Sequence, residues 1–190
     1  MSKLETLAEF LECSVEEVNK EYEFFVTNND EAYLVFTDDE ADARFKEYME
    51  GVLMDVGLCA FTDNAKSDIM DTCVHTDYLR SIIEDEIKLW CEDLKEDNAL
   101  EEILSDSNCE TLEEYIENTV NEWENYECEY FINSYGEDGF NDMVRENIDD
   151  ILDINAICEY VKRVDGRGNC LASWDGIENE LNNYYIYRID

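Results

Sequence analysis

Residues 77–94, DYLRSIIEDEIKLWCEDL, carry the strongest structural pattern in this sequence of 190 residues. Apolar side chains recur there every three or four positions, at Leu79, Ile82, Ile83, Ile87, Trp90, Cys91 and Leu94. Because an α-helix turns once in about 3.6 residues, this spacing places them on one face and the acids on the other. The stretch predicts a long amphipathic helix with a buried apolar face.

Capping boxes mark where further helices start. In each, Ser or Thr is followed three residues later by Glu, and the two side chains bond the free backbone amides of the first turn. They begin at Ser2, Ser14, Thr37 and Thr111. We expect a short helix after each serine, one from Thr37 to about Met54, and a long one from Thr111 through Tyr130 to a break at Gly136 and Gly139. Helical spacing resumes over 140–161.

Two segments have the composition of β-strands. Residues 22–36, YEFFVTNNDEAYLVF, contain two β-rich runs around Asn28-Asn29-Asp30, which predicts a hairpin. After Gly168 the composition becomes rich in aromatic and β-branched residues, in the runs CLASW and YYIYRI, with a turn expected between them at Asp175-Gly176. The predicted fold class is α+β, mostly helical, with short antiparallel β-hairpins near the N-terminal third and at the C-terminus.

The sequence contains no low-complexity linker and no internal repeat, so we expect a single acidic domain over residues 1–190. Its sub-regions are predicted to be a helix–hairpin–helix part (1–76), an acidic helical part (77–165) and a β-rich C-terminal segment (166–190).

The net charge is extreme. Asp and Glu number 51 against 13 Lys and Arg, a formal charge of −38, and residues 84–153 alone hold 25 acids and three bases. Mutual repulsion of like charges destabilises a compact state, so this excess requires a reason. The 12 Tyr, eight Phe and three Trp exclude a disordered acidic tail. Direct binding to nucleic acid or to an anionic membrane is disfavoured, because Lys and Arg supply affinity for phosphate.

Carboxylate spacing resembles that of phosphates. Helix positions i and i+4 lie about 6 Å apart along the axis, and two phosphate steps of a DNA strand advance about 6.8 Å. At the charge density of duplex DNA, 38 charges correspond to about 65 Å of axis, or roughly 19 base pairs. The candidate partner-binding residues are Glu92, Asp93, Glu96, Asp97, Glu101, Glu102, Glu110, Glu113, Glu114, Glu117, Glu124, Glu127, Asp142, Glu146, Asp149 and Asp150.

Aromatic residues lie among these acids, where they could anchor a partner. Helical spacing favours a core position for Tyr115 and Trp123, and partial exposure for Tyr130 and Tyr135. It leaves open whether position 126 or position 127 faces inward; Tyr126 is expected to be partly exposed.

Motifs for catalysis and metal binding are missing from the sequence. The chain has one histidine, His75, no phosphate-binding glycine loop, no nucleophile elbow and no EF-hand loop. Its eight cysteines form no C-x-x-C pair and are expected to be reduced, mostly buried thiols. In VDGRGN, Arg167 and two glycines favour a tight turn over a phosphate-binding one, because the surrounding charge is negative. We therefore expect no enzyme, no cofactor and no metal site.

The start of the chain, MSKLETLAEFLEC, lacks the basic and apolar regions of a signal peptide. No apolar stretch approaches the length of a membrane span. A cytoplasmic location is expected, within the host cell if the protein is encoded by a phage.

In its charge and composition the chain resembles the acidic DNA-mimic proteins of bacteriophages and mobile elements, a class that includes antirestriction and anti-CRISPR proteins. YLVFTDDEADARFKEYMEG (33–51) and RGNCLASWDGIENELNNYYIYRID (167–190) also resemble segments of small phage proteins. These two stretches cover under a quarter of the chain and carry no catalytic motif. The resemblance implies a protein that occupies the nucleic-acid groove of a restriction enzyme or Cas effector, in some members as a dimer.

These observations predict a non-enzymatic inhibitor that fills the basic groove of a host defence nuclease, first of all a CRISPR–Cas effector, with a homodimer as one possible state. The alternatives are an antirestriction protein that blocks a restriction–modification enzyme, and an acidic adaptor or chaperone for a basic protein. Adaptation to high salt also produces acidic surfaces, but eight cysteines and a bulky aromatic core are not typical of it.

Overall fold

The computed structural model describes residues 1–96 and 99–190 and divides the chain into two compact units. Unit 1 comprises residues 1–52 and 154–190, and unit 2 comprises residues 53–153. Their boundaries differ from those expected for sub-regions of a single domain, since the two ends of the chain belong to one unit.

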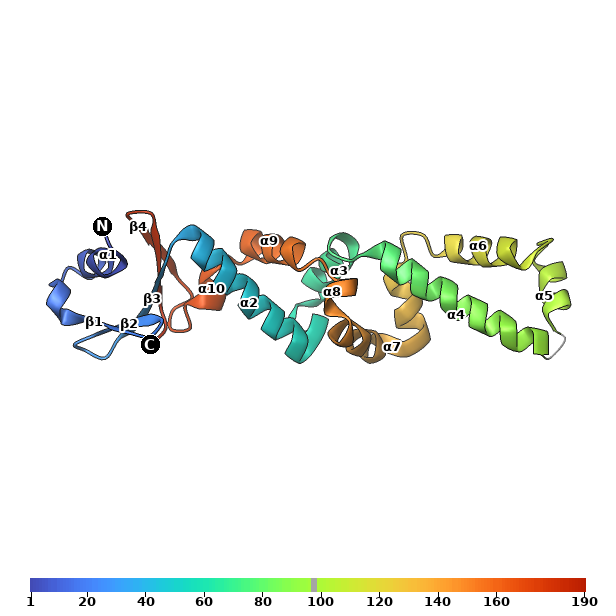
Figure 1. The fold of residues 1–190 in the computed structure, drawn as a ribbon, viewed down its shortest axis with the longest axis horizontal. Coiled ribbons are helices and arrows are strands. Elements are labelled where there is room, and N and C mark those ends of the chain that lie inside the picture. Colours follow the sequence, from blue (N-terminus) through green and yellow to red (C-terminus); the bar gives the residue numbers. More distant parts are fainter. Residues whose placement is uncertain (97–98) are drawn as a thin grey trace. The chain divides into compact units, whose positions relative to one another are not determined.

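Unit 1 is built around a five-stranded antiparallel sheet with strand order β1-β2-β3-β5-β4 (Figure 1). Its strands are β1 (Val18–Glu21), β2 (Phe24–Thr27), β3 (Ala32–Phe36), β4 (Glu178–Leu181) and β5 (Tyr184–Arg188). Its helices are α1 (Lys3–Phe10), the 3-10 turn η1 (Val15–Glu17), the first part of α2 (Asp38–Val56), α9 (Ile154–Val164) and α10 (Gly168–Leu171). The α+β, mostly helical fold with strands near both ends of the chain is therefore confirmed.

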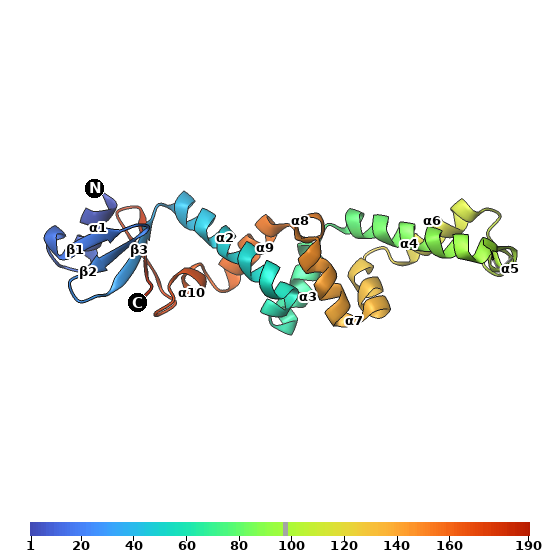
Figure 2. The ribbon, with the colours of Figure 1, turned by 60° about the horizontal axis from the view of Figure 1, so that its bottom comes forward.

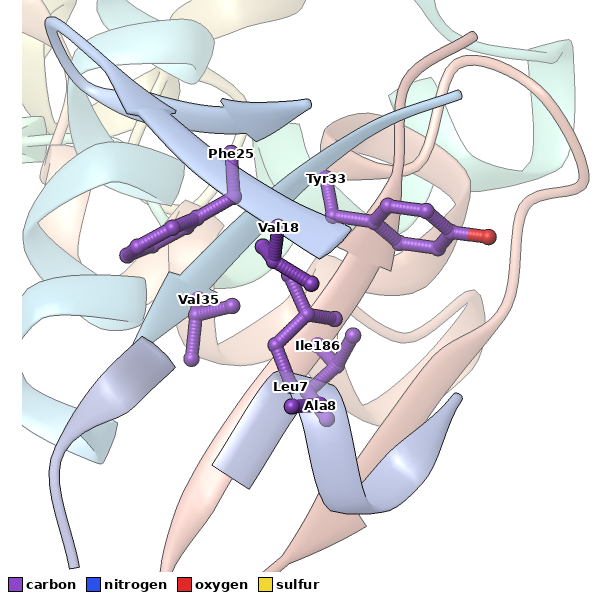
Figure 3. Close-up of a cluster of buried hydrophobic side chains, with 7 residues drawn as sticks. All are labelled: Leu7, Ala8, Val18, Phe25, Tyr33, Val35 and Ile186. Carbon is purple, nitrogen blue, oxygen red and sulfur yellow. The ribbon is translucent and has the colours of Figure 1, made fainter. Parts of the chain in front are cut away.

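One face of the sheet packs against α1, and the close-up in Figure 3 shows this contact. Leu7 and Ala8 of α1 meet side chains of β1, β2, β3 and β5 in one cluster of buried residues. Tyr33 belongs to this cluster at its edge, where its ring extends to one side with the hydroxyl at the far end (Figure 3). The pairing of β3 with β5 brings Val35 opposite Ile186, so the same core ties the two ends of the chain together.

Two local expectations for unit 1 are wrong. The capping box at Ser14 forms, but it opens only the 3-10 turn η1, because Val18 enters strand β1 opposite Thr27 and is buried. Tertiary pairing here outweighs a local helix signal. The C-terminal hairpin turns at Asn182-Asn183, whose φ angles of 54° and 63° suit the twist of a two-residue turn, whereas the turn at Asp175-Gly176 forms but precedes β4 and joins no two strands.

Unit 2 is built from helices, with one isolated bridge between Val74 and Leu152. It contains the last residues of α2, the 3-10 turn η2 (Gly57–Ala60), α3 (Asp63–Thr72), α4 (Thr76–Glu96), α5 (Leu100–Asp106), α6 (Leu112–Glu122), α7 (Glu127–Glu146) and α8 (Ile148–Ile151). The helix predicted from residues 77–94 is α4, and its buried face includes Leu79, Ile83 and Ile87.

The long helix expected from Thr111 is instead two helices. Thr111 caps α6 as predicted, but α6 ends at Glu122, and Asn125 with φ of 69° turns the chain before α7 starts. Gly136 interrupts α7 as expected, with φ of 76° and ψ of 169°, whereas Gly139 stays helical. No described helix has both the length and the apolar composition required to cross a membrane.

Candidate partner-binding surface

Unit 2 carries most of the charge. Residues 53–153 hold 30 acids and five bases, a net charge of −25, whereas unit 1 holds 21 acids and eight bases, a net charge of −13. At the charge density of duplex DNA, 25 charges correspond to about 43 Å of axis. Unit 2 is therefore the candidate surface.

The predicted site residues are almost all on the surface of helices. Exposed among them are Glu92, Asp93, Glu101, Glu102, Glu110, Glu113, Glu114, Glu117, Glu124, Asp142, Glu146, Asp149 and Asp150. Asp97 and the side chain of Glu96 lie outside the part of the chain that the structure describes. The exposed acids form two groups, one along α4, α5 and α6 and their flanking turns, and one on α7 and α8.

Glu127 is a correction to the predicted site, because its side chain is only 4% exposed. It stands at the start of α7, where free backbone amides favour a carboxylate, and its Oε1 lies 4.0 Å from Nε of Arg80 on α4. Tyr126, which competed with it for the inward position, is exposed. Glu127 is therefore a buried link between α4 and α7 and is removed from the candidate surface.

Few cations offset the exposed acids. Within the described residues, Lys66 pairs with Glu137 at 3.2 Å, Lys88 with Glu84 at 2.7 Å and Arg145 with Asp142 at 3.2 Å. Arg80 lies 3.6 Å from Glu124. Of the predicted site acids, only Glu124, Glu127 and Asp142 thus have a cationic partner in the described part of unit 2. The remaining exposed acids carry uncompensated charge.

The antiparallel pair α4 and α6 concentrates this charge. The two helices run side by side (Figure 2), with Arg80 donating to Asn121 at 2.9 Å near one end and Trp90 beside Tyr115 near the other. A groove of about 440 Å³ lies between them, with Ile116 and Val120 in its lining. Its remaining lining residues are Asp77, Arg80, Ser81, Glu84, Lys88, Glu113, Glu117 and Asn121.

Large aromatic side chains are exposed within this acidic unit. Trp90 is 46% exposed, although helical spacing placed it on the buried face, and Tyr126 and Tyr135 are 55% and 56% exposed. Trp90 leans on half-buried Tyr115, with ring centroids 6.3 Å apart. The expected exposure of Tyr126 and Tyr135 is confirmed, and these rings supply apolar contact area among the carboxylates.

Glu86 of α4 accepts hydrogen bonds from two tyrosines of α7. The Tyr130 hydroxyl donates to it at 2.8 Å and the Tyr135 hydroxyl at 2.6 Å. Burial and the bond to Glu86 raise the pKa of Tyr130, and the bond to Glu86 together with burial raises that of Tyr135. Both phenols therefore stay protonated as donors at neutral pH and fix α7 against α4.

Arg167, in unit 1, has a structural role. Its side chain is 3% exposed and pairs with Asp38 at 2.8 Å, Asp42 at 2.6 Å and Glu178 at 2.9 Å, and it lies over the Tyr185 ring. Because the guanidinium is buried and each of its three nitrogens already donates to a carboxylate, it is not available to bind a phosphate. The cluster fastens the start of α2 to strand β4.

The described residues contain no group of three or more His, Cys, Asp and Glu side chains that could hold a metal ion, and all eight cysteines are free thiols. His75 is exposed, and its backbone amide donates to Ile151. Comparison of the chain with protein-family models, curated proteins and solved structures found no match.

Proposed function

We propose that this protein is a non-enzymatic inhibitor that imitates nucleic acid and occupies the basic groove of a host defence nuclease, a CRISPR–Cas effector, in the host cytoplasm. The observation that carries the proposal is the uncompensated, exposed charge of unit 2, ordered along helices. Rows of carboxylates on α4, α5 and α6 present negative charge at intervals close to those of phosphates.

The inhibitor acts by binding. Attraction between the acidic surface of this protein and the basic groove of the nuclease raises the association rate, and added salt weakens that attraction. Affinity beyond the charge comes from apolar contacts, for which Trp90 and Tyr126 are available. Occupation of the groove excludes the nucleic acid that the nuclease must bind.

Competition for the groove tests the proposal. A fluorescent DNA target is bound to a guide-loaded Cas9-type effector, and the protein is titrated in while anisotropy reports the released DNA. We expect stoichiometric displacement at about 150 mM salt and much weaker displacement at about 500 mM. Displacement from a restriction enzyme alone would assign the protein to the antirestriction class, and displacement from neither would refute the mimic.

Two matched variants separate the site from overall charge. Each variant removes four exposed carboxylates from one unit. The unit 2 variant is Glu92→Gln, Asp93→Asn, Glu101→Gln, Glu102→Gln, and the unit 1 variant is Glu12→Gln, Glu16→Gln, Glu21→Gln, Glu23→Gln. We expect the first to weaken displacement at least about tenfold and the second less than about threefold. Equal losses would indicate an adaptor that recognises charge alone.

A further inference from the structure

The groove between α4 and α6 differs from a plain acidic surface in having an apolar floor. Ile116 and Val120 are each 8% exposed, so a narrow strip of hydrocarbon remains accessible between the two helices. Its volume of about 440 Å³ falls within the range of small-ligand sites. The groove is large enough to receive a side chain of a partner.

The walls of the groove are negative. Asp77 on α4 and Glu113 and Glu117 on α6 are exposed and have no cationic partner in the described part of the chain. Both cations in the lining are already engaged: Lys88 with Glu84 and Asp85, and Arg80 with Asn121, Glu124 and Glu127. The unpaired acids therefore set the sign of the field inside the groove.

The α6 wall of the groove carries its charge in a row, as the wall of a nucleic-acid groove does. Glu113 and Glu117 lie one helical turn apart on this wall, about 6 Å along the helix axis, which is close to the advance of two phosphate steps along one DNA strand, about 6.8 Å. Proteins insert arginine into DNA grooves of enhanced negative potential.

We infer that the α4–α6 groove receives an arginine side chain of the partner nuclease; this inference rests on the proposed function. The apolar stem of the arginine covers Ile116 and Val120, and its guanidinium pairs with Glu113 and Glu117 on the α6 wall. Arginine fits better than lysine because its planar fork binds carboxylates through two hydrogen bonds at once, and it is less strongly hydrated.

Calorimetry with two synthetic peptides, nona-arginine and nona-lysine, tests this inference on the full chain at about 150 mM NaCl. The peptides have equal charge, so a difference between them reports the head group and its stem. We expect nona-arginine to bind at least about threefold more tightly than nona-lysine, with a charge-assisted fork as the cause.

A matched pair of variants locates the binding. Glu113→Gln, Glu117→Gln removes two charges from the groove, and Asp149→Asn, Asp150→Asn removes two exposed charges of unit 2 outside it. We expect about a tenfold loss of nona-arginine affinity for the first and less than about twofold for the second. Equal losses would overturn the inference.

A steric variant leaves both the charge and the core intact. Ser81 is exposed and lines the groove, so Ser81→Phe fills it, while Ser105→Phe on α5 adds the same bulk elsewhere. Ser81→Phe should abolish the preference for arginine over lysine and Ser105→Phe should retain it; the reverse or an equal result refutes the inference.

The inference and the proposed function can fail separately. If the groove variants do not behave as expected while the wild-type chain still displaces DNA, only the role of the groove is refuted. If displacement fails while arginine binding persists, the proposed function is lost instead.

Discussion

Unit 1 and unit 2 differ in how far basic residues offset their acidic residues. In unit 1, six of eight basic residues form ion pairs, and the central one, Arg167, is buried among three carboxylates. In unit 2, five bases face 30 acids, and most of the acids whose side chains the structure describes are exposed. Each base of unit 1 therefore faces fewer than three acids, whereas each base of unit 2 faces six, so repulsion among carboxylates is stronger in unit 2 and more of its charge is left for a partner.

The tryptophans allow the two units to be followed separately. Trp174 lies in unit 1, and Trp90 and Trp123 lie in unit 2. Trp90→Phe, Trp123→Phe leaves a fluorescence signal from unit 1, and Trp174→Phe leaves one from unit 2. The predictions below use these two backgrounds.

The largest effect is expected from the buried cation of unit 1. Arg167→Met removes the shared partner of Asp38, Asp42 and Glu178 and should lower the free energy of unfolding of unit 1 by about 2–4 kcal/mol, the loss of charged hydrogen bonds to carboxylates that solvent still reaches. Urea unfolding followed by Trp174 measures it. Exposed Arg163, which lies over the Tyr160 ring, is the control, and Arg163→Met should cost less than about 1 kcal/mol. Equal losses would mean that the cluster does not stabilise unit 1.

Two glycines should respond with opposite signs. Gly136 in unit 2 has φ of 76° and ψ of 169°, a conformation that strains any L-residue, so Gly136→Ala should destabilise unit 2 by about 1–3 kcal/mol. Gly51 lies inside α2, and a Cβ there would meet no atom within 4 Å. Gly51→Ala should therefore stabilise unit 1 by about 0.5–1 kcal/mol. Urea midpoints in the matching tryptophan backgrounds test both, and a neutral Gly136→Ala would argue against the kink.

Added salt should stabilise unit 2 more than unit 1, which is the next largest expected effect. Raising NaCl from about 20 mM to 500 mM shortens the screening length and weakens repulsion among the 25 net charges of unit 2. We expect the melting temperature of unit 2 to rise by about 5 °C, equivalent to about 1 kcal/mol, and that of unit 1 to rise less. A larger rise in unit 1, or a requirement for molar salt by both units, would contradict the contrast and favour adaptation to high salt.

The smallest effect concerns acid. Burial raises the pKa of Asp42, but hydrogen bonds from Lys162 and Arg167 outweigh it and hold that pKa below its usual value. A hydrogen bond from Lys3 and another from the Thr37 amide lower the pKa of Glu40. Because both pKa values are lowered in the folded state, the stabilisation is present above the unfolded-state values of about 4 and is lost as the pH falls below them.

Asp42→Asn, Glu40→Gln should flatten the fall in stability of unit 1 between pH 5 and pH 3. The difference should stay below about 1 kcal/mol, because both side chains are nearly half exposed and solvent screens them. Urea midpoints read from Trp174 at several pH values measure it. An unchanged pH dependence would show that other groups control acid unfolding of unit 1.

Much of the secondary structure could be predicted locally. The capping boxes at Ser2 and Thr37 and the side-chain cap at Thr111 start helices because their bonds involve residues three apart. Where a segment pairs with a distant partner, the local signal failed, as at Val18, which joins a strand after a capping box.

The candidate site also has features that local spacing predicts and features that depend on contacts between distant residues. Helical periodicity put the acids of α4–α6 on the surface, but it could not show that Glu127 is buried beside Arg80 or that Trp90 is exposed. The groove between α4 and α6 had no signal in the sequence, since its walls come from residues 25 to 44 positions apart.

The sequence by itself determined the charge, its concentration in residues 84–153 and the helical faces that carry it, because these depend on composition and on spacing within one turn. Only the tertiary structure decided that the chain's two ends build one unit, that Arg167 is an internal ion-pair centre, and that two acidic helices enclose an apolar-floored groove. Each of these rests on contacts between residues far apart in the chain, whose energies no local pattern encodes.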